Sequence, residues 1–441
     1  MEQRRREVNH KGISLFSGVG GLDAGLIQRG IKIVGAWDID EAARETYHRN
    51  FGLRPQGVDI AQLRAKMVPK CDIVLAGPPC QGFSSLARRD RGDKRNQLIV
   101  SAARLIAETK PKIFLIENVL GLLWYEGGKF IRRLESILSR GGLHSAVIQV
   151  DCASLGLAQR RRRVLIVGGR GASGLEVIRR VQVLAKSRAS AKHIGDVVLG
   201  GGIKNAPNHF PITRLLPTYS KIIRHIQPGQ KLCDTRLGPH SVHSWEIPEV
   251  FGETTSDQRR VLEHLVRLRR THRGRRYRRI GDGRAVTVLQ LSKFSGLHEV
   301  VIRRELKKLK LVGYVAQPRQ GYFDIARRFN GRFKRLPLSG VSSAVLADFG
   351  RARNVLHPTE PRGLTVRECA RLQGFADKFV FVGTTSQQYQ LVANAFPPPI
   401  SRKLADAVIG ALHSTHTRSA SNSHTNSSQG LARRDGAGFL R

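Results

Sequence analysis

The sequence is poor in cysteine, and the few cysteines it has are scattered. Five occur in 441 residues, an odd number, with no CxxC pair and no histidine nearby at ligand spacing. This pattern argues against a disulfide framework and against a zinc site. We therefore expect free thiols and no bound metal. The five are Cys71, Cys80, Cys152, Cys233 and Cys369.

Long hydrophobic runs are also missing. No apolar segment reaches the length that a membrane span needs, and the opening MEQRRREVNHKG lacks the apolar part of a signal peptide. These absences predict an intracellular, cytoplasmic protein. A length of 441 residues with 40% hydrophobic residues suffices for two or three domains with their own cores.

Acidic residues are scarce relative to basic ones. The chain holds 75 Lys and Arg against 34 Asp and Glu, a formal net charge of +41. Such an excess repels itself unless a polyanion lies nearby, and nucleic acid is the obvious candidate. A coding sequence of high GC content would also raise the arginine count without any partner. We expect nucleic-acid binding and, with it, association with the nucleoid.

Apolar and amphipathic segments alternate through residues 10–170. Short β-branched runs predict strands, and helical spacing of apolar residues predicts the helices between them. Strands joined by crossover helices form a parallel, doubly wound sheet, so we expect an α/β fold. A strand, a glycine turn and a helix are expected within 10–30, further strands at 31–40, 71–77, 111–119, 144–151 and 161–170, and further helices at 41–51, 96–110 and 129–142.

This alternation stops between residues 171 and 356, where the sequence is irregular and punctuated by Gly and Pro. The exception is 255–325. Residues 254–270 predict a capped amphipathic helix, 286–315 a helix, a turn and a second helix, and 314–325 a β-hairpin. That order is typical of a winged helix-turn-helix. The alternative is a small helical insertion whose basic face is only solvated.

The C-terminal part returns to helical patterns. TVRECARLQGF, from Thr365, and ISRKLADAVIGALH, from Ile400, each predict a helix. Residues 414–441 are polar, rich in Ser and Asn and almost free of core residues, so we expect them to be disordered.

Three features in the first half predict a site for an adenosine-containing cofactor. LFSGVGGLDAGL places glycines between a strand and a helix, where a ligand can approach the backbone closely. It matches neither the GxGxxG fingerprint nor a phosphate loop, and such glycines can also serve packing alone. Asp38 and Asp59 follow the next two strands and could bind ribose hydroxyls, although Asp38 and Asp40 could equally cap a helix.

A second group of residues indicates covalent chemistry. Cys80 lies in LAGPPCQGFSS, where two prolines stiffen a turn beyond a strand and present the thiol as a nucleophile. A small buried structural residue is the alternative, and it fits this loop poorly. Glu117, in FLIENV, ends a strand at the same edge and can act as an acid. In QRRRR the alternating Arg161 and Arg163 should point to one face.

These motifs, in this order, resemble those of the DNA (cytosine-5)-methyltransferases. FSGVGG is similar to the family's S-adenosylmethionine loop, GPPCQGFS to its nucleophile loop, and ENV and QRRRR to its acid and arginine motifs. RGLTVRECARLQGF and VANAFPPP are similar to the two closing motifs. The resemblance covers residues 12–170 and 330–412. It implies a Rossmann-like, S-adenosylmethionine-dependent domain at 10–170, completed by 357–413, with a smaller target-recognition domain at 171–356.

The resemblance also implies roles for individual residues. Cys80 would attack C6 of a cytosine flipped out of duplex DNA, Glu117 would bind N3 and the exocyclic amine, and Arg161, with Arg163 beside it, would steady the base. Gln81 and Ser84 would hold the base and its phosphate, and Arg275, Arg276 and Arg278 would contact DNA phosphates. The cofactor would be held by Phe16, Ser17, Gly18, Gly20, Gly21, Leu22, Asp38, Ile39, Asp59, Ile60, Pro79, Leu98, Asn394 and Ala395.

The sequence departs from the family pattern at four positions. Asp38 stands where the family has glutamate. Ala393 replaces a glycine, and the added β-carbon should crowd the cofactor. Phe396 replaces a small aliphatic residue and Ala376 a proline. The resemblance implies either a restriction-modification enzyme or a solitary methylase. The expected partners are double-stranded DNA and, in the first case, a cognate restriction endonuclease, with the chain acting as a monomer. Two alternatives are an RNA-directed enzyme with the same motifs and a DNA-binding regulator on an inactive scaffold.

Overall fold

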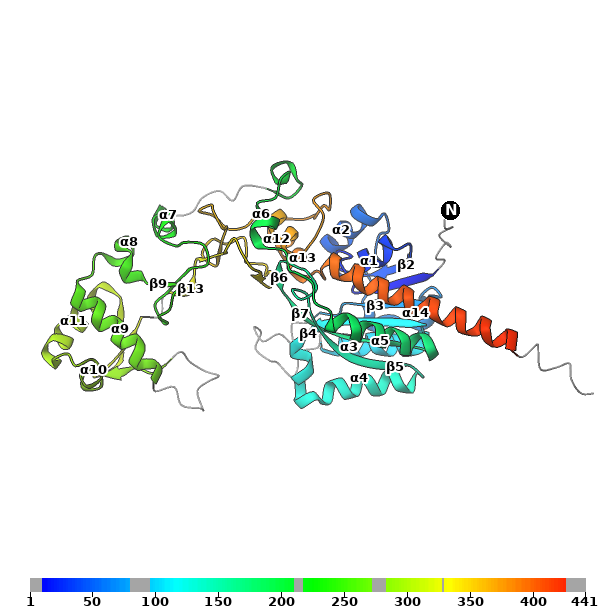
Figure 1. The fold of residues 1–441 in the computed structure, drawn as a ribbon, viewed down its shortest axis with the longest axis horizontal. Coiled ribbons are helices and arrows are strands. Elements are labelled where there is room, and N and C mark those ends of the chain that lie inside the picture. Colours follow the sequence, from blue (N-terminus) through cyan, green and yellow to red (C-terminus); the bar gives the residue numbers. More distant parts are fainter. Residues whose placement is uncertain (1–9, 80–95, 210–216, 272–282, 327–328, 426–441) are drawn as a thin grey trace, which may run out of the picture. The chain divides into compact units, whose positions relative to one another are not determined.

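The computed structural model describes residues 10–79, 96–209, 217–271, 283–326 and 329–425 (Figure 1). These divide into two units, one made of Met1–Lys192 and Gln373–Arg441 and the other of His193–Leu372. The sequence predicted boundaries at 170 and 357 instead. Helix α5 (Gly171–Lys186) accounts for the first difference, because its Val177 and Val181 are buried in the core of the first unit.

A six-stranded sheet with the order β2-β1-β3-β4-β7-β5 forms the centre of the first unit. Strands β2, β1, β3 and β4 are parallel, as predicted, but β7 is antiparallel to both β4 and β5. The chain between β5 and β7 contains no crossover helix, and a short connection favours an antiparallel pair. The strands are β1 (Lys11–Leu15), β2 (Lys32–Trp37), β3 (Ile73–Ala76), β4 (Ile113–Val119), β5 (His144–Asp151) and β7 (Arg162–Gly169), with the two-residue β6 (Gln159–Arg160) before β7.

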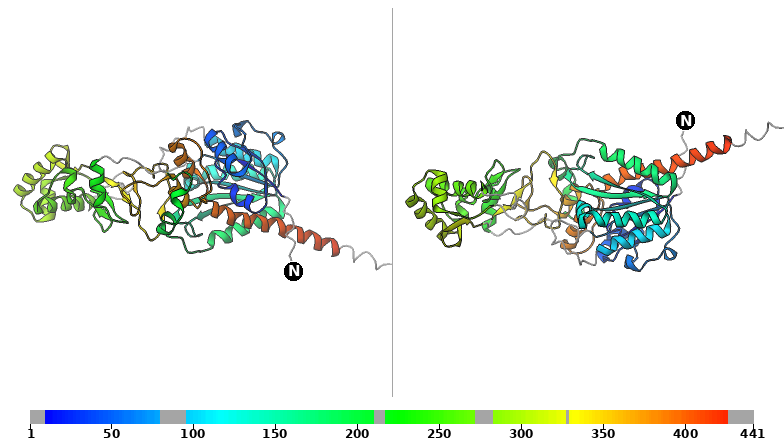
Figure 2. Two further views of the ribbon diagram at one scale, coloured as in Figure 1. Left: turned by 90° about the horizontal axis from the view of Figure 1, so that it is seen from above. Right: turned by 90° about the horizontal axis from the view of Figure 1, so that it is seen from below.

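Helices cover both faces of this sheet, as Figure 2 shows. Successive residues of a strand point to opposite faces, so each strand supplies two cores. In β3, Val74 faces the core shared with α3 and α4, whereas Leu75 faces the core shared with α5 and α14. The helices of this unit are α1 (Asp23–Gln28), α2 (Glu41–Phe51), α3 (Asn96–Thr109), α4 (Lys129–Arg140), α5, α13 (Thr385–Asn394) and α14 (Pro398–Thr425), with 3-10 turns η1 (Ile60–Gln62), η2 (Ala65–Met67) and η3 (Leu120–Gly128).

The C-terminal segment packs directly on the beginning of the chain. A β-carbon on Gly25 of α1 would lie 2.2 Å from the backbone of Ser401 in α14, so only glycine allows this approach. The backbone N–H of Gly25 donates to Ser401 Oγ at 2.9 Å. This contact fixes the chain that follows residue 373 against the glycine turn after β1.

Helix α14 extends to Thr425, although the sequence predicted a disordered tail from residue 414. No Gly or Pro lies between residues 411 and 425, so nothing in that stretch interrupts a helix. Residues 426–441 lie outside the described part of the chain. Among the helices in the described ranges, none is long and apolar enough to cross a membrane.

The second unit combines short strands with small helices. Strands β8 (Lys231–Cys233), β9 (Ser241–Val242) and β13 (Asn330–Arg332) form a sheet with the order β13-β8-β9. In the RGLTVRE motif, Arg362 binds both carboxylate oxygens of the buried Glu368 at 2.8 Å. The other elements here are α6 (Ile194–Val198), η4 (Ile203–Asn205), α7 (Pro217–Arg224), η5 (Ser244–Glu246), α8 (Pro248–Phe251), β14 (Lys334–Arg335), β15 (Ser342–Ser343), β16 (Val355–Leu356) and α12 (Val366–Leu372).

Residues 256–325 form a module with its own core inside the second unit, which we call the insert module. Its helices α9, α10 and α11 surround buried aliphatic side chains, and its strands form a sheet with the order β10-β12-β11. Thr255 and Gln258 form a capping box at the start of α9, as predicted. The elements are α9 (Ser256–Thr271), β10 (Val286–Thr287), α10 (Val288–Ser295), α11 (Glu299–Val312), β11 (Val315–Arg319) and β12 (Tyr322–Ile325).

A buried ion pair joins α9 to β12 in this module. Arg269 Nε lies 2.7 Å from Asp324 Oδ1, and the side chains are 0% and 7% exposed. Removing one partner leaves a buried charge unpaired, so Asp324→Ala should lower the free energy of unfolding by about 3–5 kcal/mol. Chemical denaturation of the full chain measures this, with the exposed Asp257→Ala as control. A loss below about 1 kcal/mol would contradict the prediction.

Candidate active site

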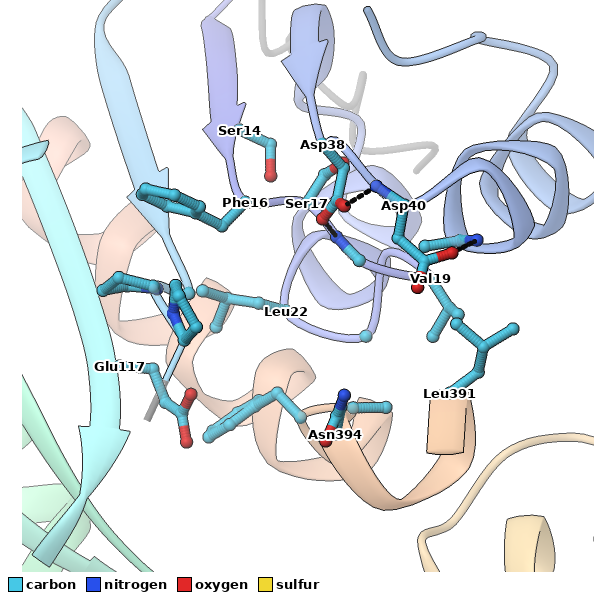
Figure 3. A pocket seen from close by; sticks show the side chains of 18 of the residues that line it. Ser14, Phe16, Ser17, Val19, Leu22, Asp38, Asp40, Glu117, Leu391 and Asn394 are labelled. Atoms are coloured by element: carbon cyan, nitrogen blue, oxygen red, sulfur yellow. Dashed lines mark hydrogen bonds between the residues drawn. The ribbon is translucent and has the colours of Figure 1, made fainter. Parts of the chain in front are cut away.

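A cavity of about 430 Å³ opens at the carboxyl edge of the parallel strands (Figure 3). It is lined by residues of the first unit that come from the carboxyl ends of β1 to β4 and the chain after them, from the start of α2 and α3, from the start of β7, and from the end of α13 with the two residues that follow it. Of the predicted cofactor residues, all except Gly20 line it, together with Glu117, Arg161 and Arg163. Sequence reasoning missed Ser14, Val19, Asp23, Asp40, Ala43, Val58, Gly77, Pro78, Val119 and Leu391.

The glycines after β1 divide into two roles. Gly18 has a φ of +54° and lines the cavity, and a β-carbon there would meet nothing within 4 Å. Gly20 has a φ of +79°, and its β-carbon would lie 2.4 Å from the ring of Phe51. A β-carbon on Gly21 would lie 2.3 Å from the carbonyl oxygen of Phe396. Gly18 therefore leaves its backbone open to a ligand, whereas Gly20 and Gly21 allow close packing.

Asp23 is a fully buried carboxyl group beneath this turn. Ser14 Oγ donates to its Oδ1 and the Tyr47 hydroxyl to its Oδ2, both at 2.8 Å. Burial raises its pKa to about 6, although the two hydrogen bonds favour the charged form. Asp23 thus ties β1, α1 and α2 together at the cavity floor. The sequence pattern contained no signal for this role.

The raised pKa makes stability depend on pH in a defined direction. The folded chain holds this proton more tightly than the unfolded chain, whose aspartate has the ordinary pKa of 3.8. The stabilisation of the folded chain by this tighter proton binding is complete below pH 3.8 and is lost as the pH rises through about 6. Relative to Asp23→Asn, the wild type should lose about 1 kcal/mol of unfolding free energy between pH 5 and pH 8. Urea titrations of both chains measure it, and a pH-independent difference would contradict it.

The polar residues after β2 take separate positions. Asp40, not Asp38, caps α2, because its Oδ1 accepts from the backbone N–H of Ala43 at 3.0 Å. Asp38 instead accepts from the N–H groups of Gly18 at 2.8 Å and Asp40 at 2.9 Å (Figure 3). Burial raises the pKa of Asp38. Ile39, between them, is 72% exposed on the cavity wall.

Asp59 occupies the matching position before η1. Its side chain accepts from the backbone N–H of Ala61 at 2.9 Å, so it caps this turn while lining the cavity. Ile60 beside it is buried. Pro79, which directly precedes Cys80, and Leu98 of α3 also line the cavity. The cavity therefore offers carboxylates at one end and apolar surface next to them.

Glu117 and Arg163 form an ion pair at the other end of the cavity. Arg163 Nε lies 2.7 Å from Glu117 Oε1, with both side chains about nine-tenths buried at 13% and 14% exposure. Because β7 is antiparallel to β4, its first residues lie beside the carboxyl end of β4, where Val119 pairs with Arg163. A parallel β7 would have put these arginines at the opposite edge. Figure 3 shows Glu117 facing the cavity across from Asp38.

Arg161 lines the same cavity but makes different contacts. Its Nη2 donates to the carbonyl oxygens of Ala393 at 3.0 Å and Ala395 at 2.9 Å, and the side chain is buried. Gln373 Nε2 donates to the carbonyl of Val392 at 2.8 Å. The resemblance assigned Arg161 to the base, and its side chain does line the cavity, but these bonds hold its guanidinium at the C-terminal end of α13.

The position predicted to crowd a cofactor, Ala393, lies on the cavity wall, and so do Asn394 and Phe396. Ala393 is half-buried, and its carbonyl oxygen accepts from Arg161. Asn394 Oδ1 accepts from Gln390 at 2.8 Å. The return of the C-terminal segment to this cavity agrees with the expectation from the closing motif VANAFPPP.

The predicted nucleophile Cys80 lies outside the described residues, as do Gln81, Ser84, Arg275, Arg276 and Arg278. The chain leading to Cys80 is well held. Asn118 Nδ2 donates to the carbonyl of Pro78 at 3.2 Å, and the N–H of Gly77 donates to the carbonyl of Leu15 at 3.1 Å. Pro79 then lines the cavity.

None of the four described cysteines lines this cavity. Burial raises the pKa of the Cys71 thiol to about 11 and that of Cys152 to about 12. Burial also raises the pKa of Cys369. A thiol that stays protonated near neutral pH is a poor nucleophile. Cys233 is buried as well.

The chain is similar to known proteins along most of its length. Residues 10–410 match the family described as C-5 cytosine-specific DNA methylase. The Type II methyltransferase M.HgiCI of Herpetosiphon aurantiacus is 30% identical, with alignment over 88% of this chain and 95% of its own length. The Type II methyltransferase M.BanI of Aneurinibacillus aneurinilyticus is 28% identical, with alignment over 90% of this chain and 95% of its own length.

Solved structures share the fold. A protein described as a DNA modification methyltransferase encoded within an E. coli prophage aligns with a TM-score of 0.55 and 22% identity, over 92% of this chain and 100% of that one. The Entamoeba histolytica methyltransferase EhMeth aligns with a TM-score of 0.51 and 15% identity, over 92% and 99%. From its sequence match across residues 10–410, the chain belongs to the C-5 cytosine-specific DNA methylases and is a DNA (cytosine-5)-methyltransferase.

Proposed function

We propose that the cavity binds S-adenosylmethionine and that Cys80 attacks C6 of a cytosine extruded from duplex DNA. One observation carries the proposal: a single cavity joins the carboxylates and apolar wall after β2 to the Glu117–Arg163 pair on β4 and β7. The first end suits a nucleoside, and the second suits a pyrimidine. Pro79, on the wall of the same cavity, directly precedes Cys80.

The residues present fit this cofactor. Asp38, held by two backbone N–H groups, can still accept from ribose hydroxyls, because a carboxylate has about four acceptor sites. Ile39, exposed on the wall, suits the face of an adenine ring, and the oxygen of Asp59 that does not cap η1 suits its amino group. The open backbone at Gly18 leaves room for the methionine portion. When bound, the cofactor supplies an electrophilic methyl group for transfer.

The chain's own residues then activate the base. The Cys80 thiolate adds to C6, and the electron pair of the C5–C6 double bond becomes available at C5. Glu117 relieves the charge on the ring through a proton shared with N3 and accepts a hydrogen bond from the exocyclic amine. After methylation a base, which we take to be water, removes the C5 proton, and the thiolate leaves as the double bond re-forms.

Arg163 is the arginine that we assign to the base side, because Arg161 is bonded to backbone carbonyls. Arg163 fixes the orientation of the Glu117 carboxylate through Oε1. Gln81 and Ser84 are proposed to hold the extruded base and its phosphate. The cost of extrusion is a few kcal/mol, which contacts to DNA phosphates from Arg275, Arg276 and Arg278 would offset.

The biological setting follows from the relatives. M.HgiCI and M.BanI are named Type II methyltransferases. We propose that this chain modifies duplex DNA as the methylating partner of a restriction endonuclease, as a monomer in the nucleoid. Its net charge of +41 supports binding to a polyanion.

Bisulfite sequencing of host DNA after expression tests this function. The wild type should protect cytosines within one short sequence motif, and Cys80→Ser should protect none. Methylated transfer RNA with unmodified DNA would replace the proposal with the RNA-directed alternative. Unchanged methylation by Cys80→Ser would contradict the covalent role of Cys80.

A further inference from the structure

The insert module has a feature that cytosine methylation does not require. Its elements follow the order α9, β10, α10, α11, β11, β12, and α10 begins at the residue after β10. Helices α10 and α11 are separated only by residues 296–298, and Gly296 has a φ of +69°. A short glycine-containing turn between two packed helices is typical of a helix-turn-helix, in which the second helix contacts DNA.

Helix α11 has one buried face and one exposed face. Ile302, Leu306 and Leu309 lie in the module core. On the opposite face the helix exposes aliphatic and basic side chains, and Val300 is 65% and Leu311 80% exposed. These two residues are about three helical turns apart on the same side of α11, with Arg304 and Lys307 between them. The exposed positions of α11 are Val300, Arg303, Arg304, Lys307, Lys308, Lys310, Leu311 and Val312.

The two carboxylates of α11 neutralise only part of this face, because they pair with three of its five lysines and arginines. Glu305 is buried, and Gln258 Nε2 donates to its Oε2 at 3.2 Å. Its Oε1 lies 2.6 Å from Arg304 Nε and 3.5 Å from Lys308 Nζ. Glu299, in the first turn, accepts from Arg303 at 3.0 Å. Residues 286–325 together carry seven Lys and Arg against three Asp and Glu. The exposed face of α11 therefore keeps a net positive charge between Val300 and Leu311.

The hairpin after α11 adds a further cation. Arg319 ends β11, and its guanidinium carbon lies 3.5 Å from the ring centroid of Tyr322 on β12. Stacking of this kind fixes the long side chain at the hairpin end. Gly321, with a φ of +75°, makes the turn there. The hairpin thus presents an oriented arginine in the position that a wing has in a winged helix-turn-helix.

We propose that the insert module is a winged helix-turn-helix that binds duplex DNA, with the exposed face of α11 in the major groove. A helix with side chains is about 10–12 Å across, and the groove is about 12 Å wide. The lysines and arginines meet phosphates, and Val300 and Leu311 suit thymine methyl groups. A second copy of this chain would bring like charge to the same face. The inference rests on duplex DNA being the substrate, but not on the chemistry at Cys80.

The test removes two charges from this face in the full chain. Arg303 and Lys307 are exposed, and neither is the partner of a buried carboxylate. For Arg303→Ala/Lys307→Ala we expect DNA affinity to fall about 10- to 100-fold, and the slope of log K against log salt to weaken by about 2 for two lost phosphate contacts. Fluorescence anisotropy with a labelled duplex measures both. The S-adenosylmethionine affinity should not change.

The matched control is Arg260→Ala/Arg267→Ala, which removes the same charge from α9 of the same module. Both side chains are 58% exposed. The control should change the slope by less than about 0.5. Equal slopes for the two double variants, whether both weakened or both intact, would overturn the proposal. If neither the wild type nor any variant methylated DNA, the function proposed above would be wrong. The slopes of log K against log salt would still decide whether α11 binds DNA.

A second variant tests an exposed aliphatic position of α11 without removing a positive charge. Val300→Glu should lower duplex affinity about 10-fold, because a carboxylate then faces the groove. Leu289→Glu, at a 51% exposed position on α10, is its control. Circular dichroism checks that both variants fold. Unchanged affinity in folded Val300→Glu would contradict the placement of α11 in the groove.

Discussion

Glu117→Gln should lower kcat about 10²- to 10⁴-fold, the range expected when a positioned acid is lost. The amide keeps the shape of the carboxylate but cannot hold a proton for N3 of the base. It also lacks the charge that Arg163 Nε contacts at 2.7 Å. Binding of S-adenosylmethionine should stay within about threefold, because the predicted nucleoside end of the cavity lies at β2. Single-turnover methylation of a cognate duplex measures the loss.

Glu126→Gln is the control for this variant. Glu126 is exposed in η3, shortly after β4, and does not line the cavity. It should methylate at the wild-type rate. A Glu117→Gln enzyme with kcat within fivefold of the wild type would remove Glu117 from the chemistry.

Replacing the two cavity-lining arginines of the QRRRR motif separately should give different kinetic defects. Arg163→Met should lower kcat about 10²-fold or more, because breaking a buried ion pair costs about 3–5 kcal/mol, part of which is lost in the transition state. Arg161→Met should chiefly raise the Kd for S-adenosylmethionine, by about 10- to 100-fold. It removes two bonds from a charged donor to the carbonyls of Ala393 and Ala395.

The contrast between the two arginines is itself the test. Isothermal titration with S-adenosylmethionine and single-turnover rates at saturating cofactor separate binding from chemistry. Arg162→Met is the control, since Arg162 is exposed between them. A kcat defect in Arg161→Met at saturating cofactor that equals the defect of Arg163→Met would contradict the separate roles.

The sequence predicted most of the first unit because its strands and helices are periodic. The antiparallel β7 was not predicted, since alternating strands were taken as parallel throughout. The consequence is specific. A parallel sheet would separate Arg163 from Glu117, whereas the real register places Arg163 beside Val119 at the end of β4. Helix α5 was missed because the chain was read as irregular after residue 170, although its buried Val177 and Val181 follow helical spacing.

The candidate site was predictable where a residue type carries the chemistry. Carboxylates after strands and glycines in a turn signal a ligand, and most of those residues line the cavity. Contacts between distant segments carried no such signal. The bonds from Arg161 to the C-terminal end of α13 span more than 230 positions in the chain. The raised pKa of Asp23 comes from burial, which local sequence does not encode.

The most direct measurement is covalent capture by a duplex that carries 5-fluorocytosine at the methylated position. Fluorine replaces the C5 hydrogen that a base would remove as a proton. The elimination is therefore blocked, and the bond between Cys80 and C6 should persist after methyl transfer. The account predicts a denaturant-resistant adduct that requires S-adenosylmethionine, carries one methyl group and maps to Cys80. An adduct that forms equally with Cys80→Ala, or none with the active wild type, would contradict the account.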